Sequence, residues 1–341
     1  MLDIKTLEKY DLEKMYEVYD KWPVIAKESY NSSEIISTFS DVNHIVFAGM
    51  GGSGAIGDIF SAILSKSKIH VSVVKGYLLP KTVDSDSLVI ITSVSGNTQE
   101  IITVLNSAKK MNYKIIAFSS GGKIQEYCSK NKIEHKVISQ IHSPRASFTR
   151  FLYFMLKALQ SILPIQINEI NESIKNLEIL GEQISSKNLS ENNPSIKLAK
   201  YILGMPVIYY PNGLQAAAIR FKNSLQENSK IHVIVEDVIE ACHNGIVAWE
   251  KPSTNQPILL QGDDDYIKTK ERWKILKQYF IKHNIDFYEV LSIKGGILSK
   301  IMNMIYLLDY ASIYRAVLSG IDPSSVQSID YVKYHLDHND F

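Results

Sequence analysis

The fold is decided by the stretch Ile45-Val46-Phe47-Ala48-Gly49-Met50-Gly51-Gly52-Ser53-Gly54. Its first four residues are apolar and β-prone, its last six form a glycine-rich turn, and helical spacing follows from Ala55 to Leu64. This strand, turn and helix unit recurs, with further apolar runs around Val73, over 88–92 and over 114–118. Strands that alternate with helices favour a parallel sheet covered on both faces, so the sequence predicts an α/β fold.

A second cycle of strands and helices follows in the C-terminal half of the chain. We expect strands over 206–210, 231–235, 257–260 and 287–293, and helices over 213–228, 266–282, 296–320 and 323–336. Between the two cycles we expect a long helix over 145–163 and a polar helical connection over 168–193. The last helix should open near Pro323, which suits a first helical turn. The sequence therefore predicts two α/β sandwiches in tandem, a domain over 1–155 and a domain over 156–341.

Length and composition support a folded, two-domain protein and exclude several functional classes. The chain has 341 residues, of which 45% are hydrophobic and 21% charged, unlike a disordered chain. The net charge of +1 provides no global field for nucleic acid or a membrane surface. Cys128 and Cys242 are far apart and belong to no CxxC or zinc-type cluster, so we expect no disulfide and no metal. The chain also lacks a signal-like N-terminus and a long apolar run, so we expect a cytoplasmic protein.

The glycine turn fits the pattern GxGxxG, which alone is a weak signal for dinucleotide binding. A nicotinamide site needs an acidic residue about 20 residues further on, at the end of the second strand, to hold the ribose hydroxyls. The corresponding stretch, Val71-Ser72-Val73-Val74-Lys75-Gly76, contains no carboxylate. We therefore expect no bound dinucleotide and no other cofactor.

A second loop, over 92–100, places the hydroxyls of Ser93, Ser95 and Thr98 around a glycine, between a strand and a helix start. Hydroxyls, loop N–H groups and a helix N-terminus together bind a phosphate monoester without a basic side chain. The plainer alternative is that one of these hydroxyls only caps the helix. Because the turn with Gly52 and Ser53 lies in the same sheet, the two loops together favour a phosphorylated ligand.

These residues resemble a known family, the bifunctional phosphoglucose/phosphomannose isomerases, which are built from sugar isomerase (SIS) domains. Stretch 93–100 resembles the SIS phosphate loop, and Ala48-Gly49-Met50-Gly51-Gly52-Ser53 resembles the opening turn of this subfamily. Agreement extends over nearly the whole chain. Further matching segments are Pro144-Arg145-Ala146-Ser147, Gln226-Glu227-Asn228-Ser229-Lys230, Cys242-His243-Asn244-Gly245, Leu308-Asp309-Tyr310-Ala311-Ser312 and Gly320-Ile321-Asp322-Pro323, followed by Lys333.

The resemblance implies interconversion of glucose 6-phosphate with fructose 6-phosphate, with mannose 6-phosphate as a second aldose and without a metal. A proton then moves between C1 and C2 through a cis-enediolate, for which one carboxylate suffices. Glu227 matches the family's base, and Arg145 matches the arginine that stabilises the enediolate charge. Outside this context, Glu227 would be a solvated helix end and Arg145 a surface cation.

The resemblance also implies a role for His243 in opening the sugar ring, with Lys333 nearby. Histidine exchanges protons near neutral pH, and the separation of 16 residues from Glu227 is the family's interval. In relatives this histidine comes from the neighbouring subunit, so a homodimer is expected. The plainer alternatives are a hydrogen-bonded loop histidine and a solvated lysine on an amphipathic last helix.

One departure and one alternative function bear on this expectation. Around 321–326, where relatives carry a threonine that admits both C2 epimers, this chain has Ser324, Ser325 and Val326. The resemblance therefore implies the phosphoglucose activity more directly than the phosphomannose activity. A non-catalytic sugar-phosphate sensor would keep the hydroxyl loop and dispense with the base, and the combination of Glu227 with His243 argues against it.

Overall fold

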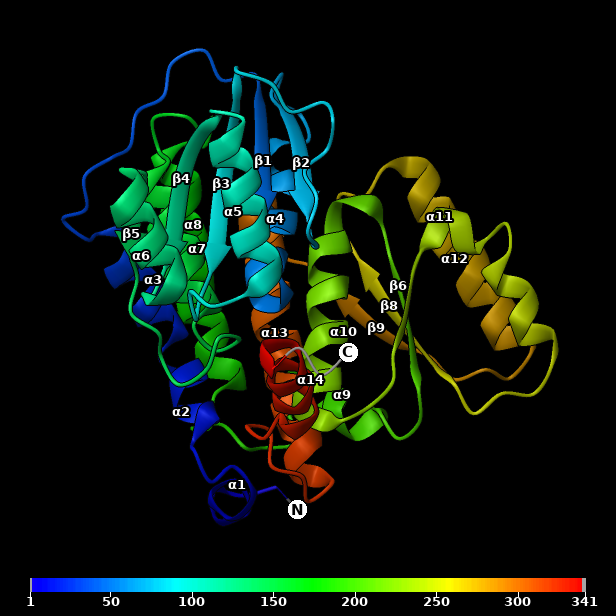
Figure 1. Cartoon of the computed structure of the whole chain (residues 1–341). Coiled ribbons are helices and arrows are strands. Elements are labelled where there is room, and N and C mark those ends of the chain that lie inside the picture. Colours follow the sequence, from blue (N-terminus) through cyan, green and yellow to red (C-terminus); the bar gives the residue numbers. More distant parts are fainter. Residues whose placement is uncertain (1, 339–341) are drawn as a thin grey trace.

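The computed structural model describes residues 2–338 and contains two parallel β-sheets (Figure 1). The first sheet has the strand order β2-β1-β3-β4-β5, and the second has the order β7-β6-β8-β9. The predicted α/β fold with parallel sheets is confirmed. The strands are β1 (His44–Ala48), β2 (His70–Val74), β3 (Ser87–Ser93), β4 (Lys114–Ser119), β5 (Glu134–Val137), β6 (Pro206–Tyr210), β7 (Ile234–Asp237), β8 (Gln256–Gln261) and β9 (Tyr288–Leu291).

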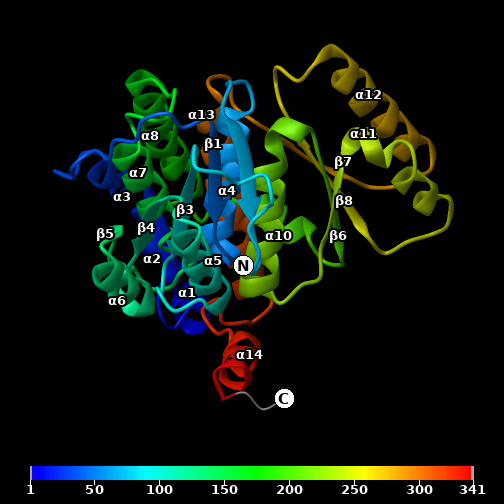
Figure 2. The ribbon, with the colours of Figure 1, turned by 45° about the horizontal axis from the view of Figure 1, so that its top comes forward.

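Helices cover both faces of each sheet and fill the space between the sheets (Figures 1 and 2). The α-helices are α1 (Ile4–Tyr10), α2 (Met15–Asp20), α3 (Trp22–Tyr30), α4 (Gly51–Leu64), α5 (Gln99–Lys110), α6 (Gly122–Asn131), α7 (Phe148–Ala158), α8 (Ile167–Ile184), α9 (Pro194–Tyr201), α10 (Gln215–Ser229), α11 (Val238–Ala241), α12 (Ile267–Lys282), α13 (Ile297–Leu318) and α14 (Gln327–His338). Short 3-10 helices span Asn212–Leu214 and Gly245–Glu250.

Alternation of side chains along the strands divides the core into an inner part and two outer parts. Along β1, Ile45 and Phe47 belong to one large central core, whereas Val46 and Ala48 belong to a separate cluster with α5 and α6. Along β6, Ile208 and Tyr210 face the same central core, and the alternate residues pack with α11 and α12. The two sheets therefore share one apolar interior, because each turns one face of its pleat toward the other.

Two helices of the C-terminal half form the centre of this shared interior. Helix α13 packs against α8, α9 and α10, and α10 also contacts α4 of the first sheet's layer. Helix α13 is buried on almost all sides, as its evenly apolar sequence requires. The contact between α10 and α4 brings the last turn of α10 close to the loops of the first sheet.

Several boundaries differ from the sequence expectation. The long helix expected over 145–163 is shorter (Phe148–Ala158), because the chain around Arg145 forms a loop whose side chains are used elsewhere. The last helix starts at Gln327 instead of near Pro323, whose carbonyl accepts a hydrogen bond from Arg145. The connection at 168–193 contains α8, which buries an apolar stripe and is not merely polar.

The N-terminal helices α1–α3 and strand β5 were not predicted. Helix α2 has only six residues, and the Asp11 carboxylate accepts hydrogen bonds from the N–H groups of Met15 and Tyr16 at its start. The domain boundary expected between residues 155 and 156 falls inside α7, and it remains a prediction. Across residues 2–338, no helix has the length and apolar character needed to cross a membrane.

Candidate functional site

The glycine turn after β1 is tight because two of its glycines touch backbone directly. A Cβ on Gly49 would lie 2.8 Å from the carbonyl carbon of Ser53, and one on Gly54 would lie 2.7 Å from the oxygen of Gly49. The Ser53 hydroxyl accepts a hydrogen bond from the N–H of Val94 at 3.3 Å. The turn after β1 is thereby joined to the loop after β3, as expected for loops at the same edge of one parallel sheet.

The loop after β3 keeps its hydroxyl groups together. The Ser93 and Thr98 hydroxyls are hydrogen-bonded to each other at 2.8 Å, and the N–H of Gly96 donates to Ser93 at 3.2 Å. Thr98 occupies the N-cap position of α5, yet its side chain makes no capping hydrogen bond. The simple capping alternative therefore fails for Thr98, and the hydroxyls line the positive end of a 12-residue helix.

Arg145 and Glu227 lie side by side although 82 residues separate them. One terminal nitrogen of Arg145 is 3.4 Å from a carboxylate oxygen of Glu227. The Nε of Arg145 donates to the Asn228 side chain at 2.8 Å, and its other terminal nitrogen donates to the carbonyls of Pro323 at 2.6 Å and Ser324 at 2.9 Å. The Arg145 side chain is 6% exposed and the Glu227 side chain 25%. The guanidinium is thus held on three sides, while the carboxylate keeps access to solvent.

The glycine turn adjoins this pair. A Cβ on Gly52 would lie 3.6 Å from the Cα of Arg145 and 3.4 Å from a terminal nitrogen of Arg220. The structure therefore assembles the predicted phosphate loops, the predicted cation and the predicted base in one region of a single chain. This arrangement depends on α10, which carries Glu227 and packs against α4, the helix that begins at the glycine turn.

Lys230 is a residue of this region to which the sequence assigned no role. Its ammonium group donates to the carbonyl of Glu227 at 2.5 Å and to that of Ser325 at 2.7 Å. Burial first, and the charge of Arg145 second, lower the pKa of Lys230. Lys230 and Arg145 together hold the loop over 322–325 through its carbonyl groups. The sequence signal was its position three residues after Glu227 in a matching segment.

A cavity of about 490 Å³ opens beside Glu227. It is lined by the end of α10, by the segment that follows it and by the start of α14: Gln226, Glu227, Lys230, Ile231, His232, Ser325, Val326, Gln327, Ser328 and Ile329. A volume of this size falls in the range of small-molecule sites. Ser325 and Val326, at which this chain departs from the family it resembles, therefore line this cavity.

The structure does not bring His243 to Glu227 within one chain. Glu227 lies in the last turn of α10, before β7 begins, whereas His243 follows α11, after β7 ends. The four residues of β7 separate these two ends by about 13 Å. His243 is exposed to solvent. Helix α11, which His243 follows, packs with α12 on the outer face of the second sheet, away from the central core (Figure 1).

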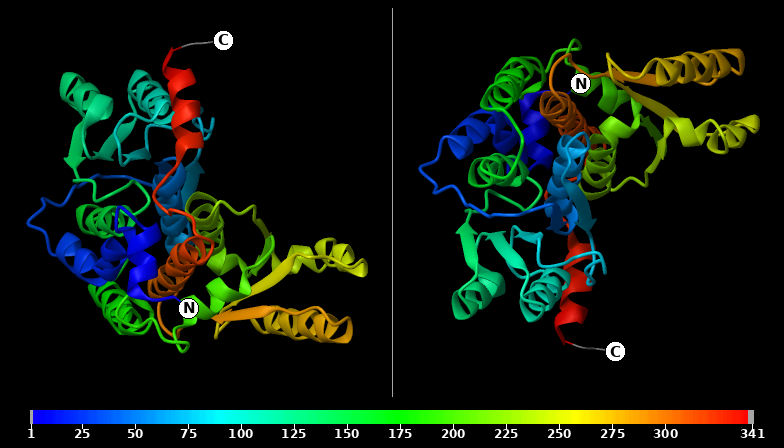
Figure 3. Two further views of the ribbon diagram at one scale, coloured as in Figure 1. Left: turned by 90° about the horizontal axis from the view of Figure 1, so that it is seen from below. Right: turned by 90° about the horizontal axis from the view of Figure 1, so that it is seen from above.

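Lys333 is also not part of the assembled region. It lies on α14 and is exposed, and α14 extends away from the rest of the molecule (Figures 2 and 3). The first turn of α14 contributes to the cavity wall, but Lys333 is not among the lining residues. Of the four predicted catalytic residues, the chain thus brings together Glu227 and Arg145 and leaves His243 and Lys333 apart.

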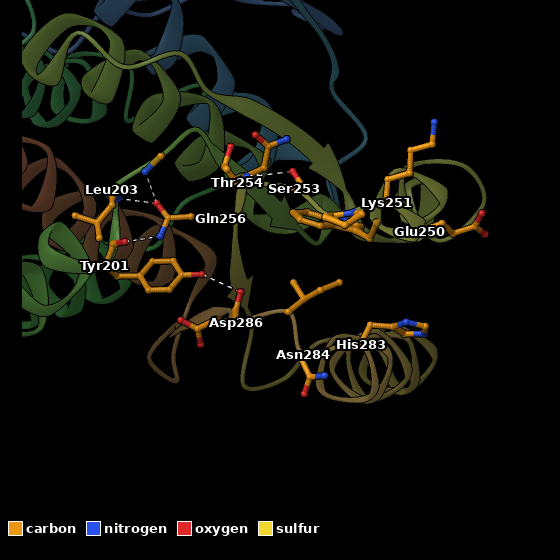
Figure 4. Close-up of a pocket in the computed structure, with 15 residues that line it drawn as sticks. Tyr201, Leu203, Glu250, Lys251, Ser253, Thr254, Gln256, His283, Asn284 and Asp286 are labelled. Atoms are coloured by element: carbon orange, nitrogen blue, oxygen red, sulfur yellow. Dashed lines mark hydrogen bonds between the residues drawn. The ribbon is translucent and has the colours of Figure 1, made fainter.

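A larger hollow of about 710 Å³ lies at the amino-terminal ends of β8 and β9 (Figure 4). Its polar groups largely bind one another: the Gln256 side chain accepts from the N–H groups of Leu203 and Gly204 and donates to the carbonyl of Tyr201. None of the predicted site residues lines it. The candidate site is instead the region around Glu227, because it adjoins the loops after β1 and β3, and ligands of α/β proteins bind at the carboxyl ends of strands.

Comparison with known proteins identifies the family to which the chain is similar. Residues 38–159 match the family described as "SIS domain", and residues 191–336 match "Bacterial phospho-glucose isomerase C-terminal SIS domain". The chain is similar to the C-terminal domain of glucosamine-fructose-6-phosphate aminotransferase from Francisella tularensis, with a TM-score of 0.69, 15% identity, and coverage of 91% of this chain and 97% of that one. At that identity the likeness shows the fold alone.

Two curated relatives give more detail. A D-glucosamine-6-phosphate 4-epimerase of Sulfolobus acidocaldarius is 29% identical over 73% of this chain and 78% of its own length. A bifunctional phosphoglucose/phosphomannose isomerase of Caldicellulosiruptor bescii is 32% identical over 94% of this chain and 98% of its own length. Since that match covers nearly the full length of both chains, the chain belongs to the bifunctional phosphoglucose/phosphomannose isomerase family.

Proposed function

We propose that this protein interconverts glucose 6-phosphate with fructose 6-phosphate, and mannose 6-phosphate with fructose 6-phosphate, at the site around Glu227. The observation that supports this best is the Arg145–Glu227 pair at 3.4 Å, beside the Gly52 turn. A carboxylate next to a fixed guanidinium suits proton abstraction beside a carbonyl, since the cation stabilises the negative charge that develops. The name of the Caldicellulosiruptor bescii relative supports the same reaction and substrates.

The phosphate group of the substrate binds at the two loops of the first sheet. Gly52 and Ser53 provide the turn at the start of α4, and Ser93, Ser95 and Thr98 provide hydroxyls at the start of α5. Both helix N-termini carry partial positive charge, and the N–H groups there suit an anion. This placement fixes one end of the sugar phosphate and directs C1 and C2 toward Glu227.

In the proposed reaction, the Glu227 carboxylate removes the proton from C2 of the open-chain aldose. The electron pair of the broken C–H bond forms the C1–C2 double bond, and the C1 carbonyl oxygen gains the negative charge. Arg145 stabilises this cis-enediolate. Glu227 then returns the proton to C1 as a carbonyl forms at C2, while the proton of the C2 hydroxyl passes to the oxygen on C1, so that the step balances.

The site is completed by a second copy of the chain. His243 is exposed and is separated from Glu227 of its own chain by the length of β7, which supports its delivery to the Glu227 of a partner subunit in a homodimer. There His243 transfers the protons of ring opening, assisted by Lys333. We further propose that the enzyme acts in the cytoplasm and needs no metal and no cofactor.

Turnover of glucose 6-phosphate and mannose 6-phosphate, measured side by side through fructose 6-phosphate release, tests this proposal. We expect turnover of both sugars by the wild type and of neither by Glu227→Gln. Glucosamine 6-phosphate serves as a third substrate, because one relative is a 4-epimerase of that compound. Conversion of glucosamine 6-phosphate alone would contradict the proposed reaction. Binding of fructose 6-phosphate without turnover of any sugar would favour a non-catalytic sensor.

A further inference from the structure

We propose that Arg220 is a positioning residue that fixes Arg145 and the Gly52 turn relative to the helix that carries Glu227. The inference rests on the proposed function, because the rate it concerns is that of the isomerisation. Arg220 and Glu227 are seven residues apart on α10, so they lie two turns apart on the same side of one helix.

The Arg220 guanidinium contacts the backbone of Arg145 directly. One terminal nitrogen donates to the main-chain carbonyl of Arg145 at 2.8 Å and to the Asp309 carboxylate at 2.7 Å. The Nε of Arg220 donates to the same carboxylate oxygen at 3.1 Å. Arg220 is 2% exposed and Asp309 is fully buried, so water does not compete for these hydrogen bonds.

The same guanidinium reaches two further parts of the site. Its other terminal nitrogen lies 3.4 Å from the place where a Cβ on Gly52 would be, so it packs directly against the glycine turn. Its central carbon lies 4.4 Å from the centre of the Phe148 ring, at the start of α7 and three residues after Arg145. One planar group therefore contacts the phosphate turn, the Arg145 segment and Phe148.

Asp309 holds the guanidinium in this orientation. Its carboxylate accepts further hydrogen bonds from the hydroxyl of Ser224 at 2.6 Å and from that of Tyr19 at 3.2 Å. These groups come from α13, α10 and α2, three elements of the central core. A buried ion pair adds little to stability compared with well-packed apolar residues, so stability alone does not explain why a charged group occupies this position.

The expected effect on the reaction follows from the role of Arg145. Arg220 fixes the main chain of Arg145 through a hydrogen bond to its carbonyl. Asn228 and the carbonyls of residues 323 and 324 fix the Arg145 side chain. A displacement of a catalytic group by about 1 Å costs about 100-fold in rate. Loss of the hydrogen bond from Arg220 should therefore lower kcat while the hydroxyl loop still binds phosphate.

The test uses the full-length enzyme and the paired substitution Arg220→Met with Asp309→Asn, which removes both buried charges together and keeps one acceptor oxygen for the Ser224 hydroxyl. We expect kcat for glucose 6-phosphate to fall at least about tenfold, with KM within about threefold of wild type. Leu177→Ala serves as the matched control, since it removes a fully buried side chain of α8 and lowers stability without touching the site. We expect its kcat to stay near wild type below the melting transition.

A double-mutant cycle with Arg145→Lys separates positioning from general structural damage. If Arg220 acts through Arg145, the combined variant loses less rate than the product of the two separate losses. Independent losses, or a paired variant with kcat within about threefold of wild type, would overturn the inference. If the paired variant does not fold, Arg220→Lys replaces it in the same cycle. This substitution keeps the positive charge but loses the planar guanidinium, which donates to Arg145 and Asp309 at once. Inactivity of the wild type toward all sugar phosphates would instead refute the proposed function.

Discussion

The two sheets place corresponding strands in corresponding positions, yet the loops at their carboxyl edges differ in chemistry. In the first sheet β1 is flanked by β2 and β3, and in the second β6 is flanked by β7 and β8. The loops after β1 and β3 are rich in glycine and hydroxyl groups. The loop after β8 is Gly262-Asp263-Asp264-Asp265, which is strongly acidic. A phosphate dianion is favoured at the first edge and repelled at the second.

The acidic loop of the second sheet serves structural contacts instead. The Asp265 carboxylate accepts from the N–H of Gly262 at 3.0 Å and from the indole N–H of Trp273 at 2.9 Å. Asp264 forms an ion pair with Lys300 of α13. The second sheet's half of the chain therefore contributes to the proposed site through α10, which carries Glu227, and not through the loop after β8. The same architecture supports different chemistry because loops and helix ends, not the sheet, carry it.

The largest expected effect tests whether α10 provides the base. In Glu227→Gln the side chain keeps its size but loses its basic lone pair, so kcat for both sugars should fall about 100- to 10,000-fold while fructose 6-phosphate still binds. Glu250→Gln, at an exposed carboxylate beside the larger hollow, is the matched control and should retain activity. A Glu227→Gln variant within about tenfold of wild type would remove this residue from the role of base.

The next effect tests whether Glu227 and His243, which lie beyond opposite ends of β7, act together in a site shared by two subunits. His243→Ala should lower kcat for the cyclic substrate about 100-fold, whereas proton exchange in open-chain sugar should persist. When refolded together, His243→Ala and Glu227→Gln subunits should form hybrid dimers with one intact site and regain about a quarter of wild-type activity. The double variant mixed with His243→Ala is the control. Absence of recovery in the first mixture would contradict a site shared between subunits.

A smaller effect compares the carboxyl edges of the two sheets. Replacing Ser95 and Thr98 with alanine should raise KM for each 6-phosphosugar at least about tenfold, because hydrogen bonds to a charged group are lost. Asp263→Ala, in the loop after β8, removes an exposed carboxylate and should leave KM unchanged. Equal KM values for the wild type and the double variant would place the phosphate elsewhere.

A stability measurement compares how closely the loops at the same two edges are packed around a glycine. Gly96 has a φ of +71°, and a Cβ there would lie 1.8 Å from the carbonyl oxygen of Gly121, so Gly96→Ala should lower the free energy of unfolding by at least about 2 kcal/mol. Gly262→Ala should lower the free energy of unfolding by less, because its Cβ would meet the flexible end of the Asp265 side chain first. Denaturant titration measures both values. A smaller loss for Gly96→Ala than for Gly262→Ala would contradict the described packing.

The smallest expected effect concerns metal ions. Because Arg145 provides the positive charge beside Glu227, prolonged chelation followed by dialysis should leave kcat unchanged for both sugars. Residues 2–338 contain no group of three or more histidine, cysteine, aspartate or glutamate side chains placed to hold a metal. Loss of activity that is restored by zinc or iron would favour a metal-dependent isomerase.

The sequence predicted the secondary-structure elements best where their pattern was local. Strand β6 was expected over 206–210 and is found there, since four consecutive β-prone residues follow Pro206 and end before Pro211. The start of α14 was placed too early because Pro323 suits a first turn. That residue instead belongs to a loop whose carbonyls bind Arg145 and Lys230, and such long-range contacts leave no periodic signal.

By itself, the sequence determined the α/β class, the two glycine and hydroxyl loops, and the residues that resemble the family's site. These depend on local chemistry, on residue order and on similarity to related chains. Only the tertiary structure decided that both sheets share one core, that Arg145 and Glu227 are neighbours, and that His243 lies beyond the far end of β7. The physical reason is that the packing of α10 against α4 and α13 sets these distances, and packing joins residues whose separation in sequence carries no information about their separation in space.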